Sequence, residues 1–159
     1  MPDMIVRLYA LPPLEDGLQA ALDSGIELRR PEPGEYDALV AWVHELFPSW
    51  VAELEVALAA APPTCYVAFA AGAPVGFAAY DATCANFFGP MGVAPEHRCS
   101  GIGRALLLAA LHAQREQGYA YSIIGGVGPV EYYEKLVSAQ LIDGSTPGIY
   151  PERSTGEGA

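Results

Sequence analysis

Apolar and polar positions follow two different periods along the chain, and the change of period predicts where strands and helices lie. Where apolar residues alternate with polar ones or run without interruption, strands are expected at residues 26–30, 64–70, 75–80 and 85–93. Where apolar residues recur every three or four positions, helices are expected at residues 35–47, 50–60 and 101–117. The pattern in the central part of the chain therefore predicts one strand, two helices, three consecutive strands and then the long helix.

The two ends of the chain carry shorter patterns. A strand at 4–9 and a helical turn at 18–22 are expected before residue 26. After the long helix, the apolar run 119–127 predicts a strand buried on both faces. A short helix at 130–137 and last strands at 140–143 and 148–150 follow, and residues 152–159 are expected to be disordered.

Three local signals refine this prediction. Gly89-Pro90 interrupts the strand at 85–93, and since proline cannot donate to a sheet ladder, a bulge or splayed pairing is expected there. Residues 71–74 read Ala-Gly-Ala-Pro, which predicts a hairpin between two strands. Ser49 is the expected N-cap of the helix at 50–60.

Length and composition predict one globular domain over residues 1–151. The 159 residues are 52% apolar and 17% charged, which supports a sizeable core, and neither a repeat nor a linker divides them. Apolar runs stay below the roughly 18 residues of a membrane span, and the first residues lack the basic start of a signal peptide, so we expect a cytoplasmic protein without a membrane partner. Three scattered cysteines and three isolated histidines predict no metal site.

The net charge of −11 disfavours nucleic acid as a partner, because phosphate binding requires a basic surface. Two interpretations of the acidity stay open: it keeps the protein soluble, or it attracts a cationic substrate. An anionic cofactor would need a local positive site, which Arg98 and Arg104 supply.

The most informative motif is R-x-x-G-x-G, formed by Arg98, Gly101 and Gly103 between a strand and the long helix. The first N–H groups of a helix have no partner within it, and with the helix dipole they suit a diphosphate. A dinucleotide fingerprint fits poorly because Leu106 stands where a small residue is needed. The ATP/GTP loop motif is absent.

From residue 26 to residue 150, the order of elements resembles the GNAT superfamily of acetyl-CoA-dependent N-acetyltransferases. The residues that carry this resemblance are Val93, Pro95, Arg98, Gly101, Gly103, Ala105 and Leu106, with Tyr-Glu-Lys-Leu at 133–136. The resemblance implies an α/β (α+β) fold, with a central mixed, mostly antiparallel sheet flanked by helices and splayed beside the cofactor site. Residues 1–25 fall outside the common core of the family and are expected to be an N-terminal extension.

The resemblance also implies acetyl-CoA as co-substrate and places its contacts. Backbone groups of Arg98, Cys99, Ser100, Gly101, Ile102, Gly103 and Arg104 would hold the pyrophosphate. Met91, Gly92 and Val93 would pair with the pantetheine arm, and an N–H at Met91 or Gly92 would face the thioester oxygen. Gly126 stands where the family often has asparagine, so backbone groups of 125–128 are expected to contact the cofactor instead.

Tyr133 is the expected catalytic residue, since a phenol can donate a proton to the leaving thiolate. Phe47, Trp50 and Asp81 are candidates for contacts with the acceptor, and Tyr132 for packing or substrate contact. The general base stays open among Asp81, Glu131, His44, Glu45 and a water chain.

These residues predict an N-acetyltransferase that acts on a primary amine of a small molecule, by direct attack in a ternary complex. The alternative is a catalytically inactive domain that binds acetyl-CoA as a sensor or partner module. The long helix at 101–117 is apolar nearly all round, which permits the homodimer that is common in the family.

Overall fold

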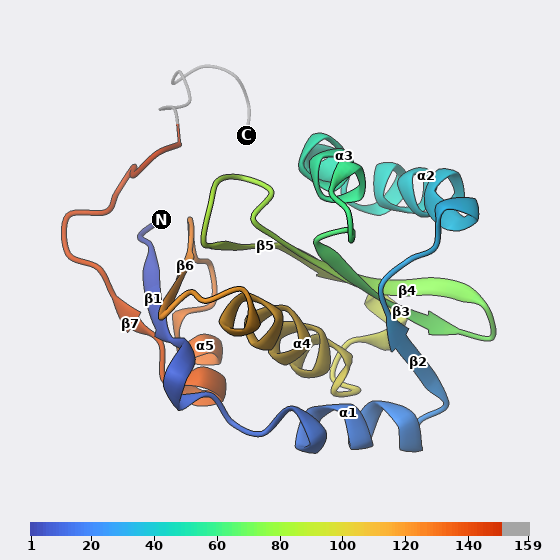
Figure 1. Cartoon of the computed structure of the whole chain (residues 1–159), viewed down its shortest axis with the longest axis horizontal. Helices are drawn as coiled ribbons and strands as arrows, with labels where there is room; N and C mark the ends of the chain where they lie inside the picture. Colours follow the sequence, from blue (N-terminus) through green and yellow to red (C-terminus); the bar gives the residue numbers. More distant parts are fainter. Residues whose placement is uncertain (151–159) are drawn as a thin grey trace.

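The computed structural model describes residues 1–150, which form one mixed seven-stranded sheet with helices on both faces (Figure 1). The strands are β1 (Met4–Arg7), β2 (Ile26–Arg29), β3 (Cys65–Ala70), β4 (Ala73–Tyr80), β5 (Phe87–Val93), β6 (Tyr121–Ile124) and β7 (Gln140–Leu141). Their order is β2-β3-β4-β5-β6-β1-β7, and among these strands only β5 and β6 pair in parallel. The expectation of a mixed, mostly antiparallel sheet is confirmed.

Five α-helices surround this sheet. They are α1 (Leu14–Asp23), α2 (Tyr36–Leu46), α3 (Val51–Ala59), α4 (Ile102–Glu116) and α5 (Val130–Val137). Helices α2 and α3 cover one face of β3 and β4, whereas α1 and α4 lie on the opposite face (Figure 1). None of the helices in the described residues is long and apolar enough to cross a membrane.

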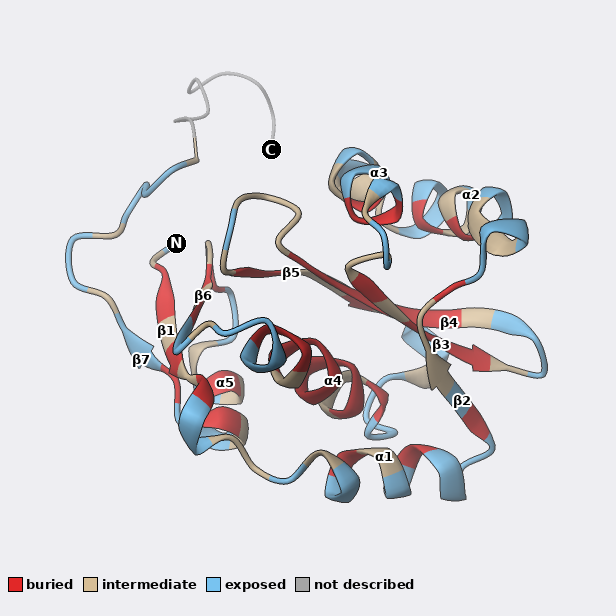
Figure 2. Cartoon of the chain, viewed as in Figure 1, coloured by how far each residue is buried: buried red, intermediate tan, exposed pale blue. Residues whose placement is uncertain are grey.

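The middle strands are buried on both faces because each face has its own hydrophobic core. Along β4, Phe77 and Ala79 pack with α2 and α3, while Ala78 and Tyr80 pack with α4. Helix α4 is the most buried of the described helices, and only its C-terminal end, at Arg115 and Glu116, is exposed (Figure 2). Its nearly all-round apolar character is therefore used within one chain, between the sheet and α1.

The sheet splits between β5 and β6. The two strands pair only through Phe87 with Ile123 and Phe88 with Ile124. From Met91 to Val93, β5 continues along β4 alone. The register of β4 against β5 shifts between Ala78 and Tyr80, opposite Gly89-Pro90, which confirms the expected bulge. The splayed sheet of the sequence prediction is thus present.

The N-terminal segment occupies a place that the sequence did not predict. Strand β1 lies between β6 and β7 and pairs antiparallel with both, and its Met4 and Val6 are fully buried. The strand expected at 148–150 does not form, and β7 has two residues where four were expected. The residues expected to be an extension thus contribute an inner strand. The tail expected at 152–159 lies outside the described residues.

Two further local expectations are wrong. Strand β6 spans four residues and its Tyr121 is 43% exposed, because α2 and α3 pack over β3 and β4 but leave the outer face of β6 uncovered. Ser49 does not cap α3: a 3-10 turn, Pro48–Trp50, leads directly into that helix, which has no side-chain cap.

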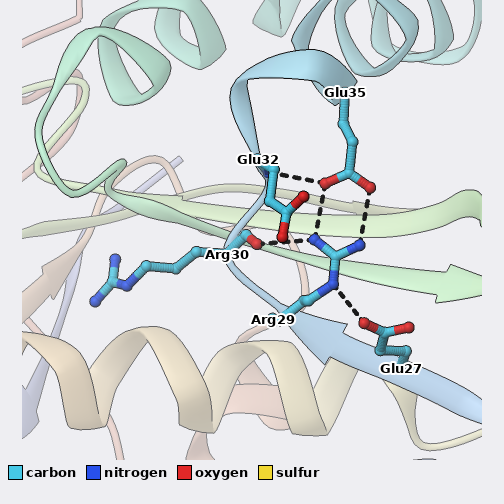
Figure 3. A network of polar contacts seen from close by, with 5 residues as sticks. All are labelled: Glu27, Arg29, Arg30, Glu32 and Glu35. Atoms are coloured by element: carbon cyan, nitrogen blue, oxygen red, sulfur yellow. Dashed lines mark hydrogen bonds and ion pairs between the residues drawn. The ribbon is translucent and has the colours of Figure 1, made fainter.

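A polar network fastens the end of β2 to the start of α2 (Figure 3). The Arg29 guanidinium donates to both carboxylate oxygens of Glu35, at 2.7 and 2.8 Å, and also to Glu27. These hydrogen bonds, together with the one from the Glu32 amide, lower the pKa of Glu35 to about 2. Because the side chains are about one-third exposed, solvent screens the pair and its main effect is to fix the geometry of this connection.

Gly76 on β4 makes room for the helix that carries the cofactor motif. A Cβ at this position would lie 3.0 Å from Leu106 Cδ1 and 3.2 Å from Ile102 Cγ2. Both side chains are fully buried and cannot move away. The small residue is therefore on the strand, and this leaves room for the large side chains of Ile102 and Leu106 on the helix.

Replacing Gly76 with valine should destabilise the fold by about 1–3 kcal/mol, because three added carbons overpack this contact. The measurement is the free energy of unfolding in urea. Gly34→Ala is the matched control, since a Cβ there has no neighbour within 4 Å, and its effect should stay within about 0.5 kcal/mol. Equal stabilities of the two variants would show that the contact between β4 and α4 is not tight.

Candidate functional site

A cavity of about 1250 Å³ lies at the split in the sheet, and residues from both faces line it. The open part of β5, the loop before α4, the segment after β6, helix α5 and the start of α3 all contribute. Of the residues proposed from the sequence, the cavity brings together Phe47, Trp50, Met91, Gly92, Val93, Arg98, Cys99, Gly101, Gly103, Arg104, Gly126 and Tyr133. They belong to segments up to about ninety residues apart in the chain.

The N-terminus of α4 opens onto this cavity without a side-chain cap among the described residues. Gly101 precedes the helix with a φ of 85°, a left-handed conformation that suits glycine, and the first helical hydrogen bond is Ala105 N to Gly101 O. The amides of residues 102–104 therefore lack helical partners. The Arg98 Nε donates to the carbonyl of Val93 at 3.2 Å, which folds the loop back onto β5.

Arg104 adds a second cation to this end of the cavity. Its Nε is buried and has no hydrogen-bond partner in the described structure, and the residue lines the cavity. Next to it, a Cβ on Gly103 would lie 3.0 Å from the Tyr132 hydroxyl. Burial raises the pKa of Tyr132, and the charge of Arg104 opposes this shift. Uncapped amides and two arginines together make a local anion site in an acidic protein.

Phe47 covers the open part of β5. A Cβ on Gly92 would lie 2.8 Å from the Phe47 ring, so only glycine permits this approach. The ring stacks on Trp50 with centroids 5.1 Å apart and an interplanar angle of 20°. The two aromatic residues that the sequence suggested for the acceptor pocket therefore form one wall, which reaches β5.

Tyr133 lies on α5 and is 9% exposed. Its ring makes edge contacts with Phe88 and Tyr132, with centroids 6.5 and 5.1 Å apart. Burial, with a smaller contribution from Tyr132, raises the pKa of Tyr133 to about 12. The phenol is therefore neutral at physiological pH, and its hydroxyl can donate a hydrogen bond.

Gly126 lines the cavity, but its amide is already in use. It donates to Asp3 Oδ1 at 2.9 Å, and the next amide, of Val127, donates to the carbonyl of Pro2 at 2.8 Å. The expectation that backbone donors of residues 125–128 contact a cofactor is thus corrected for these two amides. Asp3 is 6% exposed, and it ties the N-terminal segment to the cavity wall.

Three other expected site residues do not line the cavity. Ile102 is buried in the core under α4, and the Ser100 hydroxyl donates to the carbonyl of His97. Asp81 turns the chain after β4 with a φ of 52°, and its Oδ1 accepts from the Asn86 amide at 2.9 Å. Because that carboxylate faces its own loop, a substrate contact of Asp81 is not supported.

The suggested bases also lie elsewhere. The side chains of His44, Glu45 and Glu131 are exposed and none of them lines the cavity. A carboxylate that the sequence did not single out, Glu53, does line it, together with Thr83 and Tyr150. Glu53 follows Trp50 by three residues, so helical spacing places both side chains on the same side of the helix. This spacing from an expected acceptor contact is the sequence signal that could have identified Glu53.

The described residues hold no group of three or more His, Cys, Asp or Glu side chains that could bind a metal ion. The cysteines Cys65, Cys84 and Cys99 are free. Burial raises the pKa of the Cys65 thiol to about 12, so that side chain is inert, and only Cys99 is exposed.

Comparisons with solved structures place this geometry in one group of proteins. The N-acetyltransferase region of a fungal multidomain β-N-acetylglucosaminidase matches with a TM-score of 0.73 and 18% identity, over 89% of this chain and 19% of that one. A GCN5-related N-acetyltransferase from Sphaerobacter thermophilus matches with a TM-score of 0.66 and 20% identity, over 89% of this chain and 48% of that one. This chain thus spans about a fifth and about half of these two proteins.

A third structure is of similar size. Aminoglycoside N-acetyltransferase AAC(6')-Iy, in a complex with CoA, matches with a TM-score of 0.59 and 17% identity, over 82% of this chain and 95% of that one. At these identities the similarity shows a common fold. No protein of curated function is similar in sequence.

The amino-acid sequence gives independent support. Residues 61–136 match the family model described as "Acetyltransferase (GNAT) domain", and this segment holds β3 to β6, the R-x-x-G-x-G motif and most of α5. Residues 61–136 therefore belong to the GNAT acetyltransferase superfamily, and the fold of the described residues, with its splayed sheet, agrees with this.

Proposed function

We propose that the protein is an N-acetyltransferase that transfers an acetyl group from acetyl-CoA to a primary amine of a small molecule. The observation that carries this proposal is the continuity of one cavity from the uncapped N-terminus of α4 to the open part of β5 and Tyr133. An anion site, an unpaired strand segment and a neutral phenol are the groups that binding and cleaving such a thioester require.

The residues at the start of α4 fit the diphosphate of the donor. The amides of 102–104 and the guanidinium groups of Arg98 and Arg104 would offer hydrogen bonds to phosphate oxygens. Acetyl-CoA would supply the acetyl thioester, and the solved structure of AAC(6')-Iy contains CoA. In this chain the hydrogen-bond donors named above would hold the diphosphate of the cofactor.

The free side of β5 would hold the donor next to the amine. Residues 91–93 pair with β4 on one side only, so the other side can pair with an extended, amide-containing arm. An N–H at Met91 or Gly92 would face the carbonyl oxygen of the thioester. This donor would stabilise the negative charge that develops when the amine attacks, since it is fixed by the strand before the reaction begins.

Tyr133 would serve the leaving sulfur. Its pKa of about 12 lies above the value of about 8.5 for an ordinary thiol, so complete proton transfer from tyrosine to thiolate is unfavourable. The hydroxyl would instead donate a hydrogen bond to the thiolate while the bond to carbon breaks. Solvent would supply the proton that the thiolate gains and take up the proton that the amine loses as the C–N bond forms. The binding-only alternative differs in outcome: it binds acetyl-CoA without releasing thiol in the presence of any amine.

Gly101→Val should weaken acetyl-CoA binding at least tenfold, because a β-branched residue is strained at a φ of 85° and would shift the backbone that presents the amides of residues 102–104. Isothermal titration calorimetry with acetyl-CoA measures this. Gly118→Val is the matched control, since Gly118 follows the other end of the same helix with a φ of 101° and open space around it. Equal affinities in both variants would remove the start of α4 from the donor site.

Tyr133→Phe should lower kcat about 10- to 100-fold and leave the KM for acetyl-CoA within about twofold, because the hydroxyl acts on the developing thiolate. Thiol release, followed with a chromogenic thiol reagent across a panel of primary amines, measures both constants. Tyr121→Phe removes the hydroxyl of an exposed tyrosine and should be neutral. An unchanged kcat for Tyr133→Phe would contradict the assignment.

The pH profile provides a separate test. Since burial raises the pKa of Tyr133 from 10 to about 12, its proton stays in place throughout the range below about pH 11. The kcat of the wild-type protein should therefore rise or level off as the amine loses its proton, without a decline up to pH 10.5. A decline centred near pH 10 that disappears in Tyr133→Phe would show that the phenol ionises normally.

A further inference from the structure

The cavity contains a second polar site, on the opposite face of the sheet from the start of α4. Glu53 projects from the first turn of α3 and is the only carboxylate among the described residues that line the cavity. The Thr83 hydroxyl donates to its Oε2. One carboxylate oxygen is thereby fixed, and Oε1 remains available to a ligand.

Tyr150 closes this site from a distant part of the chain. Its hydroxyl lies against Gly125 at the end of β6, where any Cβ would collide with it. Burial raises the pKa of Tyr150, the negative charge of Glu53 raises it further, and a hydrogen bond with Thr83 lowers it. Helix α3, the loop between β4 and β5 and the C-terminal segment thus meet at the Glu53 carboxylate.

The surface next to this carboxylate is apolar and flat. Trp50, one turn before Glu53, stacks on Phe47, and the Phe47 ring lies on Gly92 of β5. Phe77 supports both rings from below, with centroids 6.2 Å from each. This wall links Glu53 to the strand that would hold the thioester.

The two ends of the cavity carry opposite charges. Arg98 and Arg104 stand at the start of α4, and Glu53 stands at the start of α3, on the other face of the sheet (Figure 1). In a protein with a net charge of −11, a cationic acceptor is also attracted from solution. The cavity therefore favours an anion at one end and a cation at the other.

We infer that Glu53, with Thr83, binds the ammonium group of the acceptor, and that the acceptor is a primary monoamine on a flat apolar body. This inference rests on the proposed function and names the substrate class of that site. A single carboxylate matches a single positive charge, and no second carboxylate among the described lining residues could pair with the further charges of a polyamine. Glu53 is thereby a specificity-determining residue.

The test uses 2-phenylethylamine, its neutral analogue 2-phenylethanol and spermidine as probes, with acetyl-CoA as donor. In the wild-type protein, kcat/KM for 2-phenylethylamine should exceed that for spermidine at least tenfold. Glu53→Gln should raise the KM for 2-phenylethylamine about 10- to 100-fold, because it removes one charge-assisted hydrogen bond, and leave the KM for acetyl-CoA within twofold. The inhibition constant for 2-phenylethanol should differ less than threefold between Glu53→Gln and the wild-type protein. A larger loss of inhibition would show that the substitution had disrupted the whole pocket.

Glu55→Gln is the matched control, since Glu55 lies on the same helix, is exposed and does not line the cavity. Unchanged KM for 2-phenylethylamine in Glu53→Gln, or a wild-type preference for spermidine, would overturn the inference while leaving acetyl transfer intact. Titration of 2-phenylethylamine alone, followed by tryptophan fluorescence, separates the two proposals. If the wild-type protein fails to bind acetyl-CoA, the proposed donor site is refuted. If 2-phenylethylamine still binds more weakly to Glu53→Gln than to the wild-type protein, the proposed amine site is retained.

Discussion

The site depends on one constraint in the sheet: β5 cannot pair with β4 and β6 along its whole length. The bulge at Gly89-Pro90 turns the strand while its pairing with β4 continues, and β6 keeps its pairing with β1. The strands therefore separate after Phe88, and a cavity opens in what would otherwise be the middle of the core. Unpaired backbone is normally a liability inside a protein, and under the proposed function it would be the surface that recognises the donor.

The split also connects the two faces of the sheet. Helix α4 reaches it from one face with its uncapped amides and Arg104, and α3 reaches it from the other with Glu53 and Trp50. Close packing brings each helix to its place: Gly76 accepts Leu106, and Gly92 accepts the Phe47 ring. The two ends of the cavity therefore carry opposite charges, since the positive end of α4 and the carboxylate of Glu53 come from opposite faces of the sheet.

Sequence reasoning succeeded where the determinants are local. The strands and helices between residues 26 and 117, the helix at 130–137 and the bulge at Gly89-Pro90 follow from periodicity and from the backbone properties of glycine and proline. It failed where a distant segment competes for a position. Strand β1 pairs with β6 as an inner strand, and Asp3 accepts the Gly126 amide that was expected to contact the cofactor.

The sequence by itself determined the order of elements, the start of α4 as an anion site and the tyrosine on α5, because these depend on neighbours a few residues away. Only the tertiary structure decided which acidic side chain reaches the cavity. Asp81, Glu45 and Glu131 have the same chemistry as Glu53, but one faces its own loop and two face solvent. Which of these carboxylates reaches the cavity depends on how the helices pack across the sheet. The periodicity of one chain segment does not encode that packing.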